Sequence, residues 1–262
     1  MLSEPSAAGQ PLSRTRPALR WEALFSSRLL LPAVLLLAFA VYAPTLNDYF
    51  AGDDIWFLHS ADTISVGDYI QTSFDYRDTG SLPELNRYRP LYPVAWRLQY
   101  EVFGLHAFGY HAVLVALHLA SVAVVWAIAL RLTRRAWAAG LAALIFAVHP
   151  GYADAVTWLS GGNRVFATFP LLLCVLSFMK YLHDDTAKAR NYVAACAAFL
   201  AAVLLHPAAV GLAVILSAYA FLVARPPGDA LRPGAWLPLA PFVLAAIALS
   251  SIHVWVRSHL DV

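Results

Sequence analysis

Long runs of apolar residues, separated by short polar stretches, make up most of the chain. A helix needs roughly 20 apolar residues to cross a bilayer, and several of the runs approach that length. The runs lack the period-two alternation of a membrane β-barrel. We therefore predict an all-α polytopic transmembrane helical bundle of about seven spans. The predicted spans are Leu29–Leu46, Tyr110–Leu132, Trp137–Val148, Val165–Leu182, Tyr192–Leu205, Ala208–Val223 and Trp236–Val256.

The long connection between the first two predicted spans contains three shorter segments with helical patterns. Leu91–Phe103 is apolar but contains Arg97, Gln99 and Glu101, so we expect it at the membrane interface or half-buried against the bundle. Ile55–His59 and Ile64–Phe74 are amphipathic stretches that we expect to lie flat on the membrane. Their aromatic residues, and one just beyond them, are then expected at headgroup depth: Trp56, Phe57, Tyr69, Phe74 and Tyr76.

The composition supports a membrane protein. The chain is 60% hydrophobic and 13% charged, with a mean hydropathy of +0.62, whereas a soluble domain carries about 25% charged residues. The net charge of +2 gives no reason to expect a nucleic-acid partner. The two cysteines, Cys174 and Cys196, lie inside apolar runs, so no disulfide framework is implied.

Basic residues gather on alternate connections between the predicted spans. Arginines precede the first span, and basic residues follow the second, fourth and sixth, whereas Asn47–Arg89 is rich in aspartates. Cytoplasmic loops carry an excess of Lys and Arg. We therefore predict a plasma (inner) membrane protein with a cytoplasmic N-terminus, an outside Asn47–Arg89 loop and an outside C-terminus. Residues 1–28, rich in Ser, Pro and Arg, are expected to be a disordered cytoplasmic tail, and residues 29–262 the membrane domain.

The outside loops contain the candidate site residues, beginning with Asp53 and Asp54. An acid pair about ten residues beyond a membrane span is costly unless it is solvated, paired or used. One interpretation is a catalytic carboxylate with its partner. The alternative is that the pair only caps a helix that starts at Ile55, because acids suit a helix N-terminus.

A cationic stretch closes the same loop, with the sequence Arg87-Tyr88-Arg89-Pro90-Leu91. Pro90 can open the next helix, where its missing N–H costs nothing. Arg89 would then lie beside a helix N-terminus, and two cationic features at one point favour a phosphate. The alternative is an interfacial arginine that reaches the lipid headgroups.

The second outside loop, His149–Arg164, supplies further polar residues. If it folds over the first loop, Asp154 and His149 can join the Asp53–Asp54 cluster, and Arg164 adds a cation. Each also has a local alternative: Asp154 as a solvated loop acid, and His149 in a hydrogen bond at a helix exit. His111 and His118 are seven residues apart, hence on one helical face, where we expect them to hydrogen-bond between helices.

Several short motifs, taken in order, resemble the multispanning C-fold glycosyltransferases. The motifs are Asp53-Asp54, Tyr88-Arg89-Pro90-Leu91, Phe103-Gly104, Gly109-Tyr110-His111 with His118, His149-Pro150, Asp154-Ala155-Val156-Thr157-Trp158 and Ser160-Gly161. The chain resembles in particular the protein O-mannosyltransferases and the transmembrane-plus-tetratricopeptide-repeat group, with their bacterial homologues. The resemblance covers about Leu29 to Phe199.

The resemblance implies transfer of a sugar from a polyisoprenyl-phosphate donor to an acceptor hydroxyl, on a protein or glycan, outside the membrane. It implies that Asp53 is the general base and Asp54 its partner. The expected substrate-binding residues are Arg87, Tyr88, Arg89, His149, Asp154 and Arg164. A divalent cation, Mg²⁺ or Mn²⁺, is a further expectation, with Asp54 and Asp154 as its candidate ligands.

The chain departs from the family pattern at three places. Asp154 stands where the family usually has Glu, Gly161-Gly162-Asn163-Arg164 replaces Gly-Arg-x-Asp, and His206-Pro207 replaces Lys-Glu. Family members usually have more spans, so we expect the membrane domain to be incomplete at its C-terminus. The alternative function is therefore a non-catalytic scaffold or lipid-phosphate-binding subunit. An ion-coupled transporter fits less well, because the later spans lack buried carboxylates.

Overall fold

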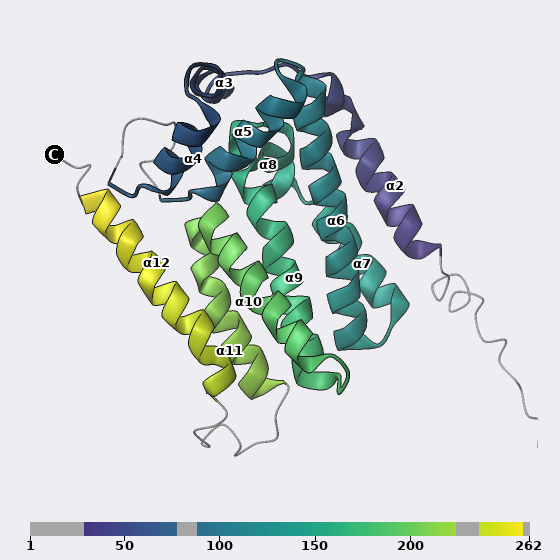
Figure 1. Cartoon of the computed structure of the whole chain (residues 1–262). Coiled ribbons are helices and arrows are strands. Elements are labelled where there is room, and N and C mark those ends of the chain that lie inside the picture. The colour runs from purple at the N-terminus through teal and green to yellow at the C-terminus, as the bar shows by residue number, and fades with distance from the viewer. Residues whose placement is uncertain (1–28, 78–87, 224–235, 259–262) are drawn as a thin grey trace, which may run out of the picture.

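The computed structural model describes residues 29–77, 88–223 and 236–258, and this part of the chain is helical with no strands. Its long helices are α2 (Leu30–Tyr42), α6 (Ala107–Thr133), α7 (Ala136–Val148), α9 (Asn163–His183), α10 (Lys188–Leu205), α11 (Leu212–Leu222) and α12 (Ala240–Ser258). They lie side by side as one bundle (Figure 1). The predicted all-α bundle is confirmed. The predicted tail, residues 1–28, and Arg87 lie outside the described residues.

The number of helices that can cross a membrane is close to the predicted seven. Five helical stretches in the described chain are long and apolar enough, namely Leu30–Asn47, Ala107–Thr133, Ser160–His183, Lys188–Leu205 and Leu237–Val256. A sixth forms if α7 and the segment Pro150–Thr157, which meet at 48°, count as one broken span. The remaining predicted span corresponds to Pro207–Leu222, which is apolar but shorter. The chain is thus an integral membrane protein.

Three short helices cover one end of the bundle: α3 (Asp54–Thr63), α4 (Val66–Phe74) and α5 (Leu91–Phe103) (Figure 1). Helix α5 packs on α3, α4, α6 and α10, so it is a buried cap of the bundle and not a span, as predicted. Arg97 holds this cap together: its guanidinium donates to the Ile64 carbonyl at 3.1 Å and pairs with Glu101 at 2.6 Å. Tyr100 adds a bond to Asp62 at 2.7 Å.

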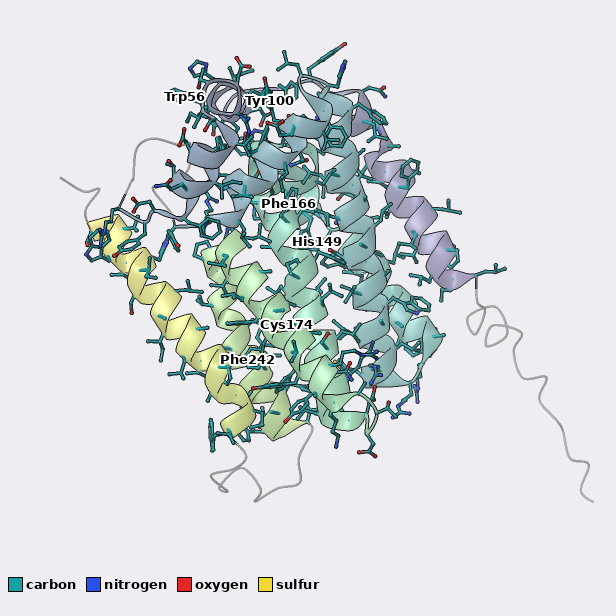
Figure 2. The ribbon with its side chains drawn as sticks, in the orientation of Figure 1. Trp56, Tyr100, His149, Phe166, Cys174 and Phe242 are labelled. Atoms are coloured by element: carbon teal, nitrogen blue, oxygen red, sulfur yellow. The ribbon has the colours of Figure 1, made fainter. Side chains whose placement is uncertain are left out.

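The cap corrects the prediction that all its aromatic residues lie at headgroup depth. Phe57 and Tyr69 are fully buried, because α5 lies over them: Phe57 stacks on Trp96 with ring centroids 4.8 Å apart, and the Arg97 guanidinium lies over the Tyr69 ring. Trp56 and Phe74 do remain exposed. Figure 2 shows Trp56 and Tyr100 at the capped end and Phe242 toward the other.

Side-chain contacts at the two ends of the bundle show which of the loops between helices lie at the same end. At the capped end, Tyr76 of the first loop contacts Trp255 near the end of α12, with ring centroids 5.2 Å apart. At the other end, the last turn of α6 is joined to the residue after α9 by two hydrogen bonds from Arg131 to Asp184, at 3.0 and 2.7 Å. The alternation predicted from charge, with aspartates at one end and arginines at the other, therefore matches the bundle. We name these the acidic end and the basic end.

Polar groups within the bundle are mostly bonded to neighbouring turns or helices. His118 joins α6 to α7 through the Ala147 carbonyl at 3.0 Å, as predicted. His111 is equally buried, but neither ring nitrogen has a hydrogen-bond partner in the described chain, so its predicted interhelical bond is wrong. Cys174 and Cys196 are both free thiols.

Candidate functional site

Asp54 is the structural centre of the acidic end. Its side chain is 1% exposed, and one carboxylate oxygen accepts a hydrogen bond from the Ala51 backbone N–H at 2.9 Å. The other oxygen accepts from the Ser160 backbone N–H at 2.8 Å and from the Ser160 hydroxyl. A buried carboxylate is stable only when its oxygens are bonded in this way. Asp54 therefore ties the start of α3 to a segment more than one hundred residues away.

Asp53 has the opposite environment. Its residue is exposed, and its carboxylate takes part in no hydrogen bond or ion pair with the described part of the chain. It occupies the N-cap position of α3, yet its side chain makes no capping bond. Side-chain capping therefore does not account for the pair: Asp54 is bonded within the fold, and the Asp53 carboxylate is exposed.

Tyr92 and Ser160 complete this network, and sequence reasoning missed both. The Tyr92 hydroxyl donates to the Leu159 carbonyl at 2.6 Å and lies 3.2 Å from the Ser160 carbonyl. Burial raises the pKa of Tyr92, so its hydroxyl stays protonated and remains a donor. Ser160 stands within the Ser160-Gly161 motif, which was the only sequence signal available. Together they bind α5 and the start of α9 to Asp54.

Arg89 precedes Pro90 at the start of α5, and its carbonyl accepts the Tyr92 N–H at 3.1 Å. Its side chain is 3% exposed. Burial lowers the pKa of Arg89 to about 10, so its guanidinium stays cationic at neutral pH. The positive charge of Arg89 acts on the buried Tyr92 hydroxyl. Pro90 is the N-cap of α5, which confirms that Arg89 lies beside a helix N-terminus.

The second predicted loop is folded against the bundle, and its second half is mostly buried. It forms η2 (Pro150–Tyr152), α8 (Ala153–Thr157) and η3 (Ser160–Gly162), and the residues from Leu159 to Asn163 are buried. This happens because the segment packs on α6, where a Cβ added to Gly162 would lie 2.7 Å from Leu114.

The predicted site residues of this segment make no direct bond to the acid pair in the described part of the chain. His149 accepts a bond from the Gly151 N–H at 3.0 Å, the local bond of a helix exit. Asp154 and Arg164 are exposed, and in the described ranges no hydrogen bond or ion pair joins either of them to Asp53 or Asp54.

The two predicted metal ligands have different surroundings. One Asp54 oxygen accepts two bonds from Ser160, whereas the other accepts one bond, from the Ala51 N–H, and keeps a lone pair for a hard cation. Asp154 is exposed. Among the residues described, no three His, Cys, Asp or Glu side chains are grouped for a metal. A divalent cation on Asp54 and Asp154 stays a prediction, and we derive no step through a metal.

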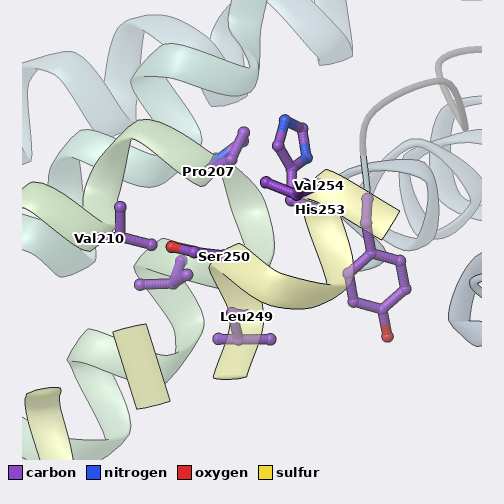
Figure 3. A pocket seen from close by; sticks show the side chains of 8 residues that line it. Pro207, Val210, Leu249, Ser250, His253 and Val254 are labelled. Atoms are coloured by element: carbon purple, nitrogen blue, oxygen red, sulfur yellow. The ribbon is translucent and has the colours of Figure 1, made fainter. Parts of the chain in front are cut away.

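A cavity of about 230 Å³ lies at the acidic end between η4 (Pro207–Gly211) and α12 (Figure 3). Tyr88, the neighbour of Arg89, forms part of its wall. The other lining residues are Val203, Pro207, Val210, Leu249, Ser250, His253 and Val254. Val210 and Ser250 also line an open apolar groove of about 560 Å³ between α11 and α12. The cavity and the groove therefore share two wall residues, and Tyr88 and His253 line the cavity alone.

These features define an integral-membrane helical bundle with a polar site at one end, beside an apolar groove. Known proteins with similar sequences support a narrower class. The chain is 32% identical over 154 residues to protein O-mannosyl-transferase Tmtc2 of Drosophila melanogaster, and 29% identical over 152 residues to protein O-mannosyl-transferase TMTC1 of Mus musculus. Each match covers 56% of this chain and 16% of the relative. The resemblance to O-mannosyltransferases with transmembrane and tetratricopeptide-repeat parts is thus confirmed over about half of the chain.

The chain spans about a sixth of the length of these curated relatives. No family model and no solved structure matches it.

Proposed function

We propose that this chain transfers a sugar from a polyisoprenyl-phosphate donor to a hydroxyl of an acceptor protein or glycan, at the acidic end of the bundle. The observation that carries the proposal is the contrast within the acid pair. Asp54 is buried and both of its oxygens accept hydrogen bonds, whereas Asp53, its neighbour, presents an exposed carboxylate. The similarity to O-mannosyltransferases supports the reaction class.

In the proposed reaction, Asp53 is the general base. Its carboxylate accepts the proton of the acceptor hydroxyl while that oxygen forms a bond to the anomeric carbon of the sugar. The bond from the anomeric carbon to the phosphate oxygen breaks, and its electron pair leaves with the phosphate. A phosphate ester is already stable as an anion, so no strong general acid is needed. Asp54 positions Asp53 by anchoring the first turn of α3.

We place the donor phosphate at the Tyr88 end of the cavity, where Arg89 is the next residue along the chain. A cation near that point stabilises the charge that the leaving phosphate gains. The apolar groove between α11 and α12 leads away from the cavity and fits the prenyl chain, because its walls are mostly Val, Ala and Ile side chains. The charge asymmetry supports an extracytoplasmic position for the acidic end, in the plasma (inner) membrane, with the N-terminus in the cytoplasm.

The proposal is tested with membranes that contain the chain, a labelled polyprenyl-phosphate mannose and a Ser/Thr-rich acceptor polypeptide. Label that passes to the acceptor, and that depends on the chain, supports transfer. Binding of the donor without transfer to any acceptor would instead identify a non-catalytic lipid-phosphate-binding subunit. If the chain neither binds the donor nor transfers the sugar, the proposal is wrong.

A further inference from the structure

A second polar crevice lies at the basic end, on the opposite side of the bundle from the acid pair. It has a volume of about 680 Å³ and opens between the last turns of α6, α9 and α11. Its polar wall consists of Arg131, Arg134, His183, Asp184 and Tyr219, and its apolar wall of Leu130, Leu132, Met179 and Val223. The proposed transfer uses none of these residues.

Most polar groups in this crevice are already bonded to one another. Arg131 holds Asp184 through both nitrogens, at 3.0 and 2.7 Å. His183 and the Tyr219 hydroxyl are 2.8 Å apart. Arg134 differs from them, because its exposed guanidinium has no ion pair or side-chain hydrogen bond with the residues that the structure describes. Among the described residues that line the crevice, Arg134 is therefore the cation that remains available to bind an anion.

The position of Arg134 is set by its backbone. The residue ends α6 in the left-handed conformation, with φ of 58°, and its N–H bonds to the Leu130 carbonyl at 2.9 Å. This conformation turns the chain sharply between α6 and α7. It also separates Arg134, which lines the crevice, from Arg135, which is the N-cap of α7 and does not line it.

We propose that this crevice binds the phosphate of an anionic membrane phospholipid. Charge favours an anion, since Arg131, Arg134, Arg135, Lys180, Lys188 and Arg190 outnumber Asp184 and Asp185 at this end. A lipid fits better than a soluble phosphate because Leu130, Leu132 and Val223 are 37%, 53% and 61% exposed beside the cation. Basic pockets between transmembrane helices are known to hold lipid headgroups in this manner. The phosphate binds Arg134, and the acyl chains cover the exposed leucines and valine.

The test compares two neighbouring charge deletions in the purified chain, reconstituted in nanodiscs of phosphatidylcholine with or without phosphatidylglycerol. Arg134→Gln removes the cation that lines the crevice, and Arg135→Gln is the matched control, because it removes the same charge one residue away. Retained phosphatidylglycerol is counted by native mass spectrometry. We expect Arg134→Gln to weaken its binding about tenfold or more, the effect of losing one charge-assisted contact. Arg135→Gln should change it less than threefold.

A third variant gives an effect of opposite sign. Asp184→Asn keeps the side-chain shape but frees Arg131 from its ion pair, so phosphatidylglycerol binding should strengthen. Equal effects of the two arginine variants, equal retention of phosphatidylcholine, or no gain with Asp184→Asn would overturn the proposal. Displacement of the lipid by millimolar inorganic phosphate would also overturn it, because the site would then take a soluble anion.

Discussion

At the scale of single residues, the acid pair shows that two adjacent carboxylates can have different tasks. Asp54 accepts bonds from Ala51 and Ser160 and belongs to the fold, whereas Asp53 remains open. The sequence predicted that the pair matters, since acids beside a membrane are costly. It did not predict which acid is buried, because that depends on Ser160, whose approach requires the complete tertiary fold.

Asp54→Asn should therefore destabilise the protein. The amide keeps one acceptor but turns an N–H₂ group toward the Ala51 or Ser160 donors, so buried charge-assisted bonds are lost. We expect a decrease of about 1.5–3 kcal/mol in the free energy of unfolding, measured by thermal unfolding in detergent. Asp53→Asn is the matched control and should stay within about 0.5 kcal/mol of the wild type. Equal losses in both variants would contradict the division of roles.

Arg89 gives a second prediction at this scale. Arg89→Ala should weaken binding of a polyprenyl-phosphate ligand about tenfold to more than a hundredfold, as expected for a lost charge-assisted contact. Arg89→Lys retains the charge on a side chain with a different donor geometry, so it should recover part of the affinity. Binding is measured by ligand titration of the folded variants in detergent. Unchanged affinity in Arg89→Ala would make Arg89 only a structural residue.

At the scale of helices, apolar run length and charge predicted the elements well. The prediction that α5 is not a span was correct, and it was based on the polar residues Arg97, Gln99 and Glu101 within it. The depth of Phe57 and Tyr69 was not predictable, because an amphipathic pattern does not reveal whether lipid or another helix covers the apolar face. Likewise, the role of Tyr92 in the Asp54 network was not predictable, because it depends on a hydrogen bond to Leu159, 67 residues away.

The ion pair that joins the ends of α6 and α9 should show a defined pH dependence. Hydrogen bonds from Arg131 hold the pKa of Asp184 below its usual range, so its folded pKa is depressed. The pair therefore stabilises the fold fully above the unfolded pKa of about 3.9, and the contribution is lost as the pH falls through the lower, folded pKa. The melting temperatures of wild type and Asp184→Asn should differ by a constant amount from pH 7 to about 5 and converge in stronger acid. A difference that already vanishes near pH 6 would contradict this assignment.

At the scale of the whole molecule, the bundle has one acidic and one basic end, and the positive-inside rule orients it. In a chain with Cys174 and Cys196 replaced by alanine, Gly67→Cys tests the acidic end and Arg135→Cys the basic end. Gly67 is exposed, and an added Cβ meets no atom within 4 Å, so its replacement should be tolerated. In intact cells, a membrane-impermeant thiol reagent should label Gly67→Cys only. Labelling of Arg135→Cys before permeabilisation would reverse the orientation.

The transfer activity of Asp53→Asn tests the central claim most directly. Asn keeps the side-chain size but cannot accept the acceptor's proton, so transfer of labelled mannose from the polyprenyl-phosphate donor should fall at least about a hundredfold. Asp48→Asn is the control, because Asp48 is an exposed acid of the same loop, and it should retain near wild-type transfer. Donor binding and thermal stability should be unchanged in both variants. Near-normal transfer by Asp53→Asn, in membranes where the wild type is active, would contradict the account.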